Sequence, residues 1–205
     1  MGGEEFQAYY TLCPAEVKSL YSVQKIEYLY RINNDIDSIN ADDMLEFAGK
    51  SGDTTTLCMY LSNLSKDDAN SFLAEHAYLY KKSCKYLELK LNLSPEMSHD
   101  EAYALLEKYK DVYADDFLFH CLLARHSSLR QQNKEIIDWL QAHRSECTTD
   151  TIFEYIKVLW MNELWDDLAE LSTRLLPNEC AFNVAGYLSE SRDDNYIRRS
   201  LEIYK

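Results

Sequence analysis

The chain has 205 residues, 46% of them hydrophobic, and carries a formal net charge of −14 with an isoelectric point near 4.7. Such a length suits one ordinary domain or one stretch of a repeat array. The negative charge argues against nucleic acid or an anionic membrane as the main partner and favours proteins with basic patches. No apolar run approaches the roughly 20 residues that span a bilayer, and no apolar segment typical of a secretory signal opens the chain. We therefore expect a soluble protein.

The six cysteines are scattered, 26 to 45 residues apart, and none forms a Cys-x-x-Cys pair. That spacing predicts small buried thiols in a reducing compartment, the cytoplasm or nucleus. His120, Cys121, His126 and Cys147 resemble a metal cluster by residue type. Adjacent residues on a helix diverge by roughly 100°, however, so we expect no metal ion there and no cofactor elsewhere.

Helical periodicity is widespread and period-two alternation is almost absent, which predicts an all-α fold. We expect a single domain over residues 1–205, with irregular helices in 1–65 and stacked helical hairpins in 66–205. The breaks between the later helices are short and force neighbouring helices to lie antiparallel. In chain order the expected helices cover 14–33, 41–49, 54–64, 66–83, 84–91, 99–113, 115–131, 133–146, 149–161, 164–176, 178–191 and 193–205.

Two local patterns mark where these helices begin. Ser98 is followed three residues later by Glu101, the spacing of a capping box. Pairs of aspartates recur at the expected helix starts, where carboxylates stabilise exposed N–H groups, so we interpret them as helix signals and not as hydrolase carboxylates. The pairs are Asp42–Asp43, Asp67–Asp68, Asp115–Asp116, Asp166–Asp167 and Asp193–Asp194.

A weak internal period follows from the spacing of apolar residues. Leu87, Leu122 and Ile156 lie 35 and 34 residues apart, and Phe119 and Phe153 are also 34 apart. The tetratricopeptide repeat, or TPR, has 34 residues in two antiparallel helices. The sequence thus predicts a TPR-like helical-hairpin solenoid, an α-α superhelix. Because its last helix still offers apolar surface, we expect this chain to be the N-terminal part of a longer array, or something to dock there.

One glycine stands inside an expected helix, where it costs roughly 1 kcal/mol relative to alanine. Gly186 lies four residues after Phe182 and before Tyr187, and Pro177 closes the preceding hairpin. We expect these four residues to pack a hairpin, with Gly186 at the close approach of its two helices. A strained hinge or a ligand contact is the alternative role of this glycine.

Nothing in the sequence predicts catalysis. "AGKSG" lacks the first glycine of a phosphate-binding loop, since Met44 stands at that position, and no nucleophile elbow or His-Glu-x-x-His motif is present. We therefore expect a binding protein and not an enzyme.

Tyrosine is frequent, with sixteen in the chain, and nine of them precede residue 87. Tyrosine buries apolar area while its hydroxyl stays wet, which suits interfaces, although ordinary packing is an equal alternative. The open end of a solenoid needs a cover, and an identical subunit is the commonest one. The residues expected at a homodimer interface are Tyr10, Leu20, Tyr21, Tyr28, Tyr60 and Tyr78. Those expected in a binding groove, from helical phase, are Arg125, Tyr155, Asn183 and Tyr187.

Two stretches, "SCKYLELK…SHDEAYALLEK" (Ser83–Lys108) and Ile156–Lys205, carry a family resemblance. With them the chain resembles the N-terminal portion of the TPR scaffold subunits of the anaphase-promoting complex, a cell-cycle ubiquitin ligase. Arg198 departs from the family pattern, where a small residue is usual. The resemblance implies a non-catalytic subunit that forms homodimers through its N-terminal repeats and holds other subunits of a large assembly during cell division. The alternatives are a generic peptide-binding adaptor or chaperone, and an acidic inhibitor that imitates nucleic acid.

Overall fold

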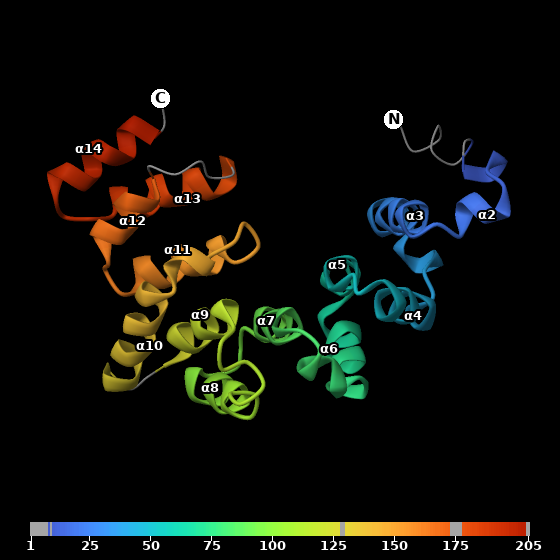
Figure 1. Cartoon of the computed structure of the whole chain (residues 1–205), viewed down its shortest axis with the longest axis horizontal. Coiled ribbons are helices and arrows are strands. Elements are labelled where there is room, and N and C mark those ends of the chain that lie inside the picture. The colour runs from blue at the N-terminus through green and yellow to red at the C-terminus, as the bar shows by residue number, and fades with distance from the viewer. Residues whose placement is uncertain (1–7, 9, 128–129, 173–177, 204–205) are drawn as a thin grey trace. The chain divides into compact units, whose positions relative to one another are not determined.

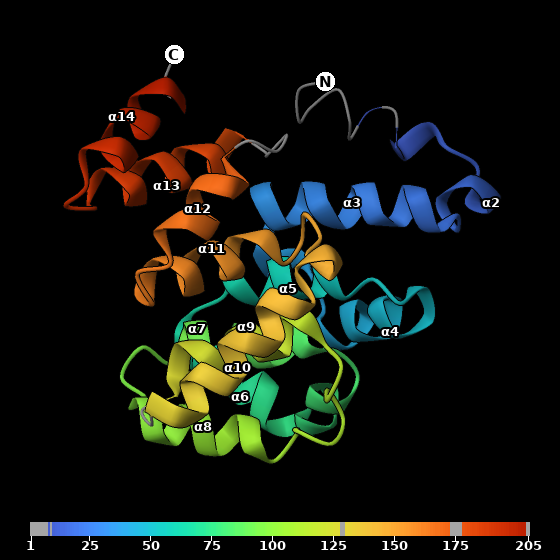
Figure 2. The ribbon, with the colours of Figure 1, turned by 60° about the vertical axis from the view of Figure 1, so that its left-hand side comes forward.

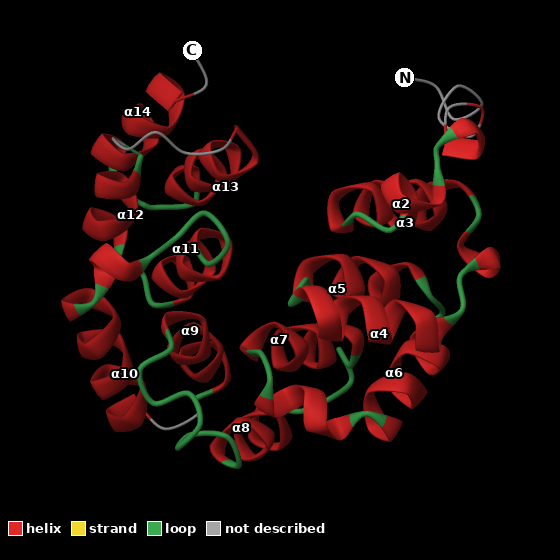
Figure 3. Ribbon diagram, turned by 45° about the vertical axis from the view of Figure 1, so that its right-hand side comes forward, coloured by secondary structure: helices red, strands yellow, loops and turns green. Residues whose placement is uncertain are grey.

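The computed structural model describes residues 8, 10–127, 130–172 and 178–203, with backbone alone for 130–132 and 178–179. All regular secondary structure in these residues is helical, without any strand, and this confirms the all-α prediction (Figure 3). The helices form two compact units, Met1–Glu96 and Met97–Lys205, which are described separately below (Figure 1). The expectation of one domain over 1–205 stays a prediction.

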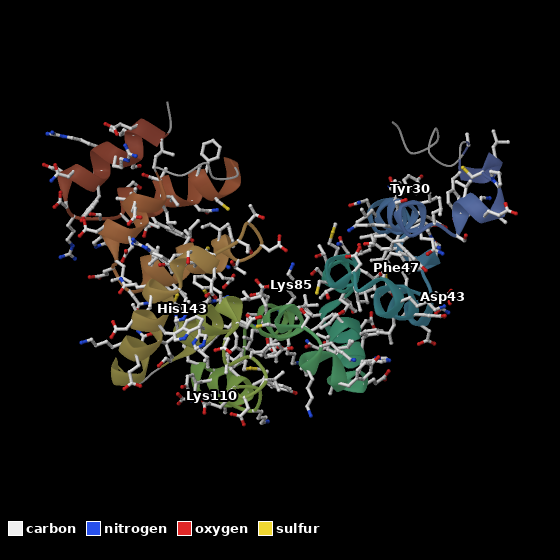
Figure 4. All side chains as sticks on the ribbon, viewed as in Figure 1. Tyr30, Asp43, Phe47, Lys85, Lys110 and His143 are labelled. Atoms are coloured by element: carbon white, nitrogen blue, oxygen red, sulfur yellow. The ribbon has the colours of Figure 1, made fainter. Side chains whose placement is uncertain are left out.

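The first unit contains helices that pack both on their neighbours in sequence and on helices further along the chain, such as α5 on α3 and on α7. The longest, α3, runs unbroken over Tyr21–Asn34 and packs on α5 (Figure 2). Phe47 of α4 contacts the rings of Tyr21 and Tyr28 on α3, with centroid distances of 5.5 and 4.9 Å (Phe47 is labelled in Figure 4). The elements of this unit are α2 (Ala15–Lys18), α3 (Tyr21–Asn34), η1 (Ile36–Ser38), α4 (Ala41–Ser51), α5 (Thr54–Asn63), α6 (Lys66–Glu75), η2 (Ala77–Lys81) and α7 (Cys84–Leu93).

The predicted helix 14–33 is interrupted between α2 and α3. The Ser19 hydroxyl donates to the carbonyl of Glu16 at 2.7 Å, a side-chain bond that competes with the helical ladder. Leu20 is then extended, with φ −66° and ψ 133°, and α3 begins at Tyr21. The prediction of one continuous helix was therefore wrong at this position.

The predicted helix 66–83 is also divided. It ends at Glu75, because a ring nitrogen of His76 bonds the Phe72 carbonyl at 2.9 Å and His76 leaves helical geometry. A 3-10 turn, η2, follows before the Ser83 hydroxyl caps α7.

Side-chain caps confirm the local patterns that mark two of the helix starts. The Glu101 amide donates to the Ser98 hydroxyl at 3.2 Å, and the Glu101 carboxylate accepts from the Ser98 amide at 2.9 Å, which completes the capping box. Asp116 caps α9 by accepting from the Phe119 amide at 2.8 Å. The other aspartate pairs stand in or beside the first turns of α4, α6, α12 and α14.

The second unit is built as two layers of helices. Helices α9, α11 and α13 follow one another in one layer, and α10, α12 and α14 form the other (Figure 3). Helix α9 contacts α10 and α11, helix α11 contacts α12 and α13, and helix α12 contacts α13 and α14. The elements are α8 (His99–Glu107), α9 (Phe117–His126), α10 (Arg130–Ala142), η3 (Arg144–Glu146), α11 (Ile152–Met161), α12 (Trp165–Leu171), α13 (Asn178–Ser189) and α14 (Asp194–Ile203).

Several helix bounds differ from prediction in this unit. The helix expected over 115–131 ends at His126, and the helix expected from 133 already begins at Arg130. The helix expected over 99–113 ends at Glu107 and leaves turns up to Asp116, while the helix expected from 149 begins at Ile152.

The first two helical pairs are offset by 35 residues. Helix α9 begins at 117 and α11 at 152, while α10 begins at 130 and α12 at 165, so both steps are 35. Leu87, Leu122 and Ile156 are all fully buried. Phe119 and Phe153 are not equivalent, however, because Phe119 is fully buried and Phe153 is 40% exposed. A 35-residue step pairs Phe119 with Glu154 instead.

The core of the second unit lies between its two layers. The described residues that are buried in it come from every helix between α9 and α13, and Tyr187, Tyr196 and Ile203 pack against its edge. These buried residues are Phe117, Cys121, Ala124, Ile137, Leu140, Ile152, Tyr155, Ile156, Val158, Leu159, Leu168, Leu171, Cys180, Val184 and Leu188.

Candidate protein-binding surface

Exposed apolar side chains collect on α11 and α13, in the layer that also contains α9. Phe153 and Met161 are 40% and 47% exposed and stand eight residues apart on α11, on the same helical face, with Lys157 midway. Phe182 of α13 is 60% exposed. We define the α11–α13 surface as Phe153, Lys157, Met161 and Phe182. Large apolar residues exposed together in this way are typical of a contact surface for another protein.

The two helices are held together beneath this surface by an aromatic stack. The Trp160 and Tyr187 rings lie 4.7 Å apart, centroid to centroid, with 17° between their planes. The Trp160 indole nitrogen donates to the Glu190 carboxylate at 2.9 Å. Burial, followed by the Glu190 and Glu154 carboxylates, raises the pKa of Tyr187, so its hydroxyl stays protonated. The stack fixes the relative position of α11 and α13.

A buried ion cluster lies next to the surface, between α9 and α11. Glu154 is only 1% exposed, and one of its oxygens accepts from Lys157 Nζ at 2.6 Å. Its other oxygen accepts from the Arg125 guanidinium of α9. The side chains of Arg125 and Lys157 are 20% and 25% exposed. The cluster therefore holds two positive charges and one negative charge, mostly away from water.

Lys157 connects the ion cluster to the exposed face. Its ammonium lies 4.5 Å from the centroid of the Phe153 ring, in the range of a cation–π contact. The Lys157 ammonium thus contacts both the buried Glu154 carboxylate and the exposed Phe153 ring.

His126, next to Arg125 in sequence, adds an uncharged imidazole to the site. Burial, with smaller contributions from Arg125 and the His99 ring, lowers the pKa of His126 to about 4. Its ring is 5.3 Å from that of His99, and both ring nitrogens are buried without a hydrogen-bond partner among the described residues. At neutral pH the ring is therefore uncharged, with one donor and one acceptor nitrogen, and adds no charge to the cluster.

The four predicted groove residues fall in different places. Arg125 lies in the ion cluster, and Tyr187 is half-buried in the stack with Trp160, while Asn183 is half-buried on α13. Tyr155 is 3% exposed and meets the Phe117 ring edge to face at 5.2 Å. Its position in a groove was therefore wrong, because helical phase turns it into the core.

The prediction for hairpin packing needs a similar correction. Phe182 is exposed, and the buried residues of α13 are Cys180, Val184, Ala185 and Leu188. Gly186 is half-buried and its carbonyl accepts from the Ser189 hydroxyl at 2.6 Å. Pro177 lies outside the described residues.

A second apolar region occurs in the first unit, on and around α2 and α3. Among the predicted interface residues, Leu20, Tyr21 and Tyr78 are 53%, 45% and 52% exposed, whereas Tyr10 and Tyr28 are half-buried. Tyr60 is 4% exposed and belongs to the core, so its assignment to an accessible interface was wrong. The sequence analysis missed three further exposed residues here. We define the α2–α3 surface as the exposed residues Leu12, Val17, Leu20, Tyr21 and Ile26, of which Leu12, Val17 and Ile26 are the three that were not predicted.

The α2–α3 surface is anchored to α5 by Asp53. This carboxylate, 7% exposed, accepts from the Tyr21 hydroxyl at 2.7 Å and pairs with Lys25 Nζ at 2.8 Å. It also accepts from the amide and hydroxyl of Thr56, at 3.0 and 2.8 Å, as the N-cap of α5. Burial alone would raise the pKa of Asp53, but the bonds from Lys25, Thr56 and Tyr21 outweigh it and hold the pKa well below its usual range.

The histidines and cysteines that resemble a metal cluster in sequence have other surroundings. The His120 and His143 rings both stack on the Trp139 ring, with centroid distances of 3.7 and 3.9 Å (His143 is labelled in Figure 4). Cys121 is buried in the core, and all six cysteines are present as thiols. Within the described ranges, no group of three or more His, Cys, Asp or Glu side chains could hold a metal ion.

A search of the described helices finds none that is long and apolar enough to cross a membrane. No family model, no curated protein and no solved structure matches this chain.

Proposed function

We propose that this protein is a non-catalytic helical-repeat scaffold that binds a segment of another protein on the α11–α13 surface. The observation that carries the proposal is the exposure of Phe153, Met161 and Phe182 within one layer of helices. Covering such side chains with a partner stabilises the complex by roughly 25 cal/mol for each Å² of apolar area removed from water.

The proposal includes a TPR-like solenoid arrangement for the second unit. It is supported by the two-layer packing of α9 to α14 and by the 35-residue step between the first two pairs. In stacked helical repeats, one layer presents side chains to a bound segment while the other supports it.

The first prediction concerns a double variant, Phe153→Ser with Phe182→Ser. Short peptides selected from a random displayed library against the full chain should bind this variant at least about tenfold more weakly than the wild type, because two exposed aromatic contacts are lost. Fluorescence anisotropy with the selected peptides measures the affinity. Since both side chains are already exposed, thermal unfolding should change little.

A matched control uses an exposed apolar residue outside this surface, Val112→Ser. Val112 is 48% exposed and follows α8. Equal peptide affinity of the wild type and the Phe153/Phe182 variant would contradict the proposed binding surface.

We also propose that the chain forms a homodimer through the α2–α3 surface. Leu12, Leu20 and Ile26 are each more than half exposed, as the residues of an uncovered contact surface would be. Replacing Leu20 and Ile26 together by aspartate should convert a dimer to a monomer, because charges are poorly tolerated in the centre of an interface.

Light scattering over a dilution series into the micromolar range measures this change in mass. A wild-type chain that is monomeric throughout the series would oppose the dimer and would favour the alternative, a monomeric peptide-binding adaptor or chaperone.

The narrowest form of the proposal assigns the scaffold to a ubiquitin ligase similar to the anaphase-promoting complex, in the nucleus or cytoplasm. It is supported by the resemblance of Ser83–Lys108 and Ile156–Lys205 to such subunits. The buried thiols of Cys84, Cys121 and Cys180 agree with a reducing compartment.

A further inference from the structure

The ion cluster of Arg125, Glu154 and Lys157 contains two positive charges and only one negative charge. Glu154 offers two carboxylate oxygens, and each is already used by one cation. The cluster therefore retains one excess positive charge on side chains that are 20% and 25% exposed. An additional carboxylate placed beside these partly buried cations would be stabilised by a charge-assisted hydrogen bond.

This excess of positive charge is local and is opposite in sign to the net charge of the whole chain. The formal net charge is −14. The neighbouring His126 is neutral at pH 7, so it adds no charge to the cluster. Arg125 and Lys157 thus form a local group of two cations on a chain whose overall charge is negative.

The exposed apolar residues continue on both sides of the cation. Phe153 precedes Lys157 by four residues and Met161 follows it by four, on the same face of α11. A ligand whose carboxylate reaches Lys157 can therefore bring apolar groups onto both flanks. A side chain within a continuous segment satisfies this geometry, while a terminal carboxylate extends the chain on one side only.

We propose that the α11–α13 surface recognises an internal segment of a partner protein in which an aspartate or glutamate lies between apolar side chains. The carboxylate accepts from Lys157 Nζ and the flanking apolar groups cover Phe153, Met161 and Phe182. This inference rests on the proposed function and specifies the chemistry of the partner.

The experiment uses the full chain and the peptides selected on it, synthesised with blocked ends. Each acidic peptide is paired with a copy in which asparagine or glutamine replaces the acid. The wild type should bind the acidic peptide about tenfold or more tightly than its amide copy, and added salt should reduce the difference. Lys157→Met should remove this preference, whereas Lys157→Arg should retain it.

Lys134→Met is the matched control, because Lys134 is exposed on α10 in the opposite layer. It should leave both affinities unchanged. The comparison of the two peptides on the wild type needs no variant, so a Lys157 variant that fails to fold does not prevent the test.

Three results would overturn the inference. Equal affinity for both peptides, with binding still lost in the Phe153/Phe182 variant, would contradict the acidic ligand and leave the proposed surface intact. Binding that requires a free peptide C-terminus and not the internal acid would also contradict it. Binding that survives in the Phe153/Phe182 variant would overturn the proposed function together with this inference.

Discussion

Replacing Glu154 by alanine is expected to lower the free energy of unfolding by about 2–4 kcal/mol, because removal of one member of a buried ion pair leaves its partners uncompensated. Glu154 is 1% exposed and serves both Arg125 and Lys157. The two cations keep 20% and 25% of their side-chain exposure, so part of the cost is relieved by water. Urea unfolding of both proteins, followed by circular dichroism, measures the difference.

A triple variant, Arg125→Met with Glu154→Leu and Lys157→Met, separates charge from packing. Buried ion clusters replaced entirely by apolar residues of similar volume are often as stable as the original, so this variant should lie within about 1 kcal/mol of the wild type. Phe119, one 35-residue step before Glu154, is fully buried and shows that this position can accept an apolar side chain. A triple variant no more stable than Glu154→Ala would show that the charges themselves are required.

Replacing Asp53 by alanine is expected to cost about 2–3 kcal/mol, because the variant loses the N-cap of α5 and the bonds from Lys25 and Tyr21. The ion pair with Lys25 contributes the smaller part, since the Lys25 side chain is 36% exposed. Lys25→Met, as a control, should therefore cost clearly less than Asp53→Ala. Equal losses of stability in the two variants would indicate that the ion pair, and not the cap, supplies most of the contribution of Asp53.

The contribution of Asp53 should depend on pH in a defined direction. Its pKa is lower in the folded chain than the value near 3.9 of an unfolded aspartate. The unfolded state therefore takes up a proton first as pH falls, and the stabilisation present above pH 5 is lost at more acidic pH. The difference in unfolding free energy between the wild type and Asp53→Asn should be constant from pH 6 to 8 and should shrink below about pH 4. A difference that grows on acidification would contradict the observed bonding.

The helical content and several helix starts could be predicted because they depend on local sequence. Ser98 and Glu101 form the expected capping box, and the aspartate pairs stand where helices begin. Helix ends were less predictable. The interruptions after Ser19 and at His76 arise from side chains that bond carbonyls three or four residues earlier, and hydrophobic periodicity does not register such bonds.

The candidate site was only partly predictable, for a different physical reason. Arg125 and Tyr187 were assigned to it from helical phase, but the same reasoning placed Tyr155 on the surface, and the repeat pattern placed Phe182 inside a hairpin. Phase shows which residues share a face but not which of two faces a neighbouring helix covers. Glu154 was missed, although an acidic residue inside the apolar stretch "IFEYIKVLWM" is a signal for a buried, paired charge.

Hydrogen–deuterium exchange of the full chain, with and without a selected peptide, tests the central claim most directly. The account predicts that bound peptide slows exchange in α11 (Ile152–Met161) and α13 (Asn178–Ser189) and leaves α10 (Arg130–Ala142) unchanged. Protection confined to α10, or to the first unit, would place the binding site elsewhere and contradict the account.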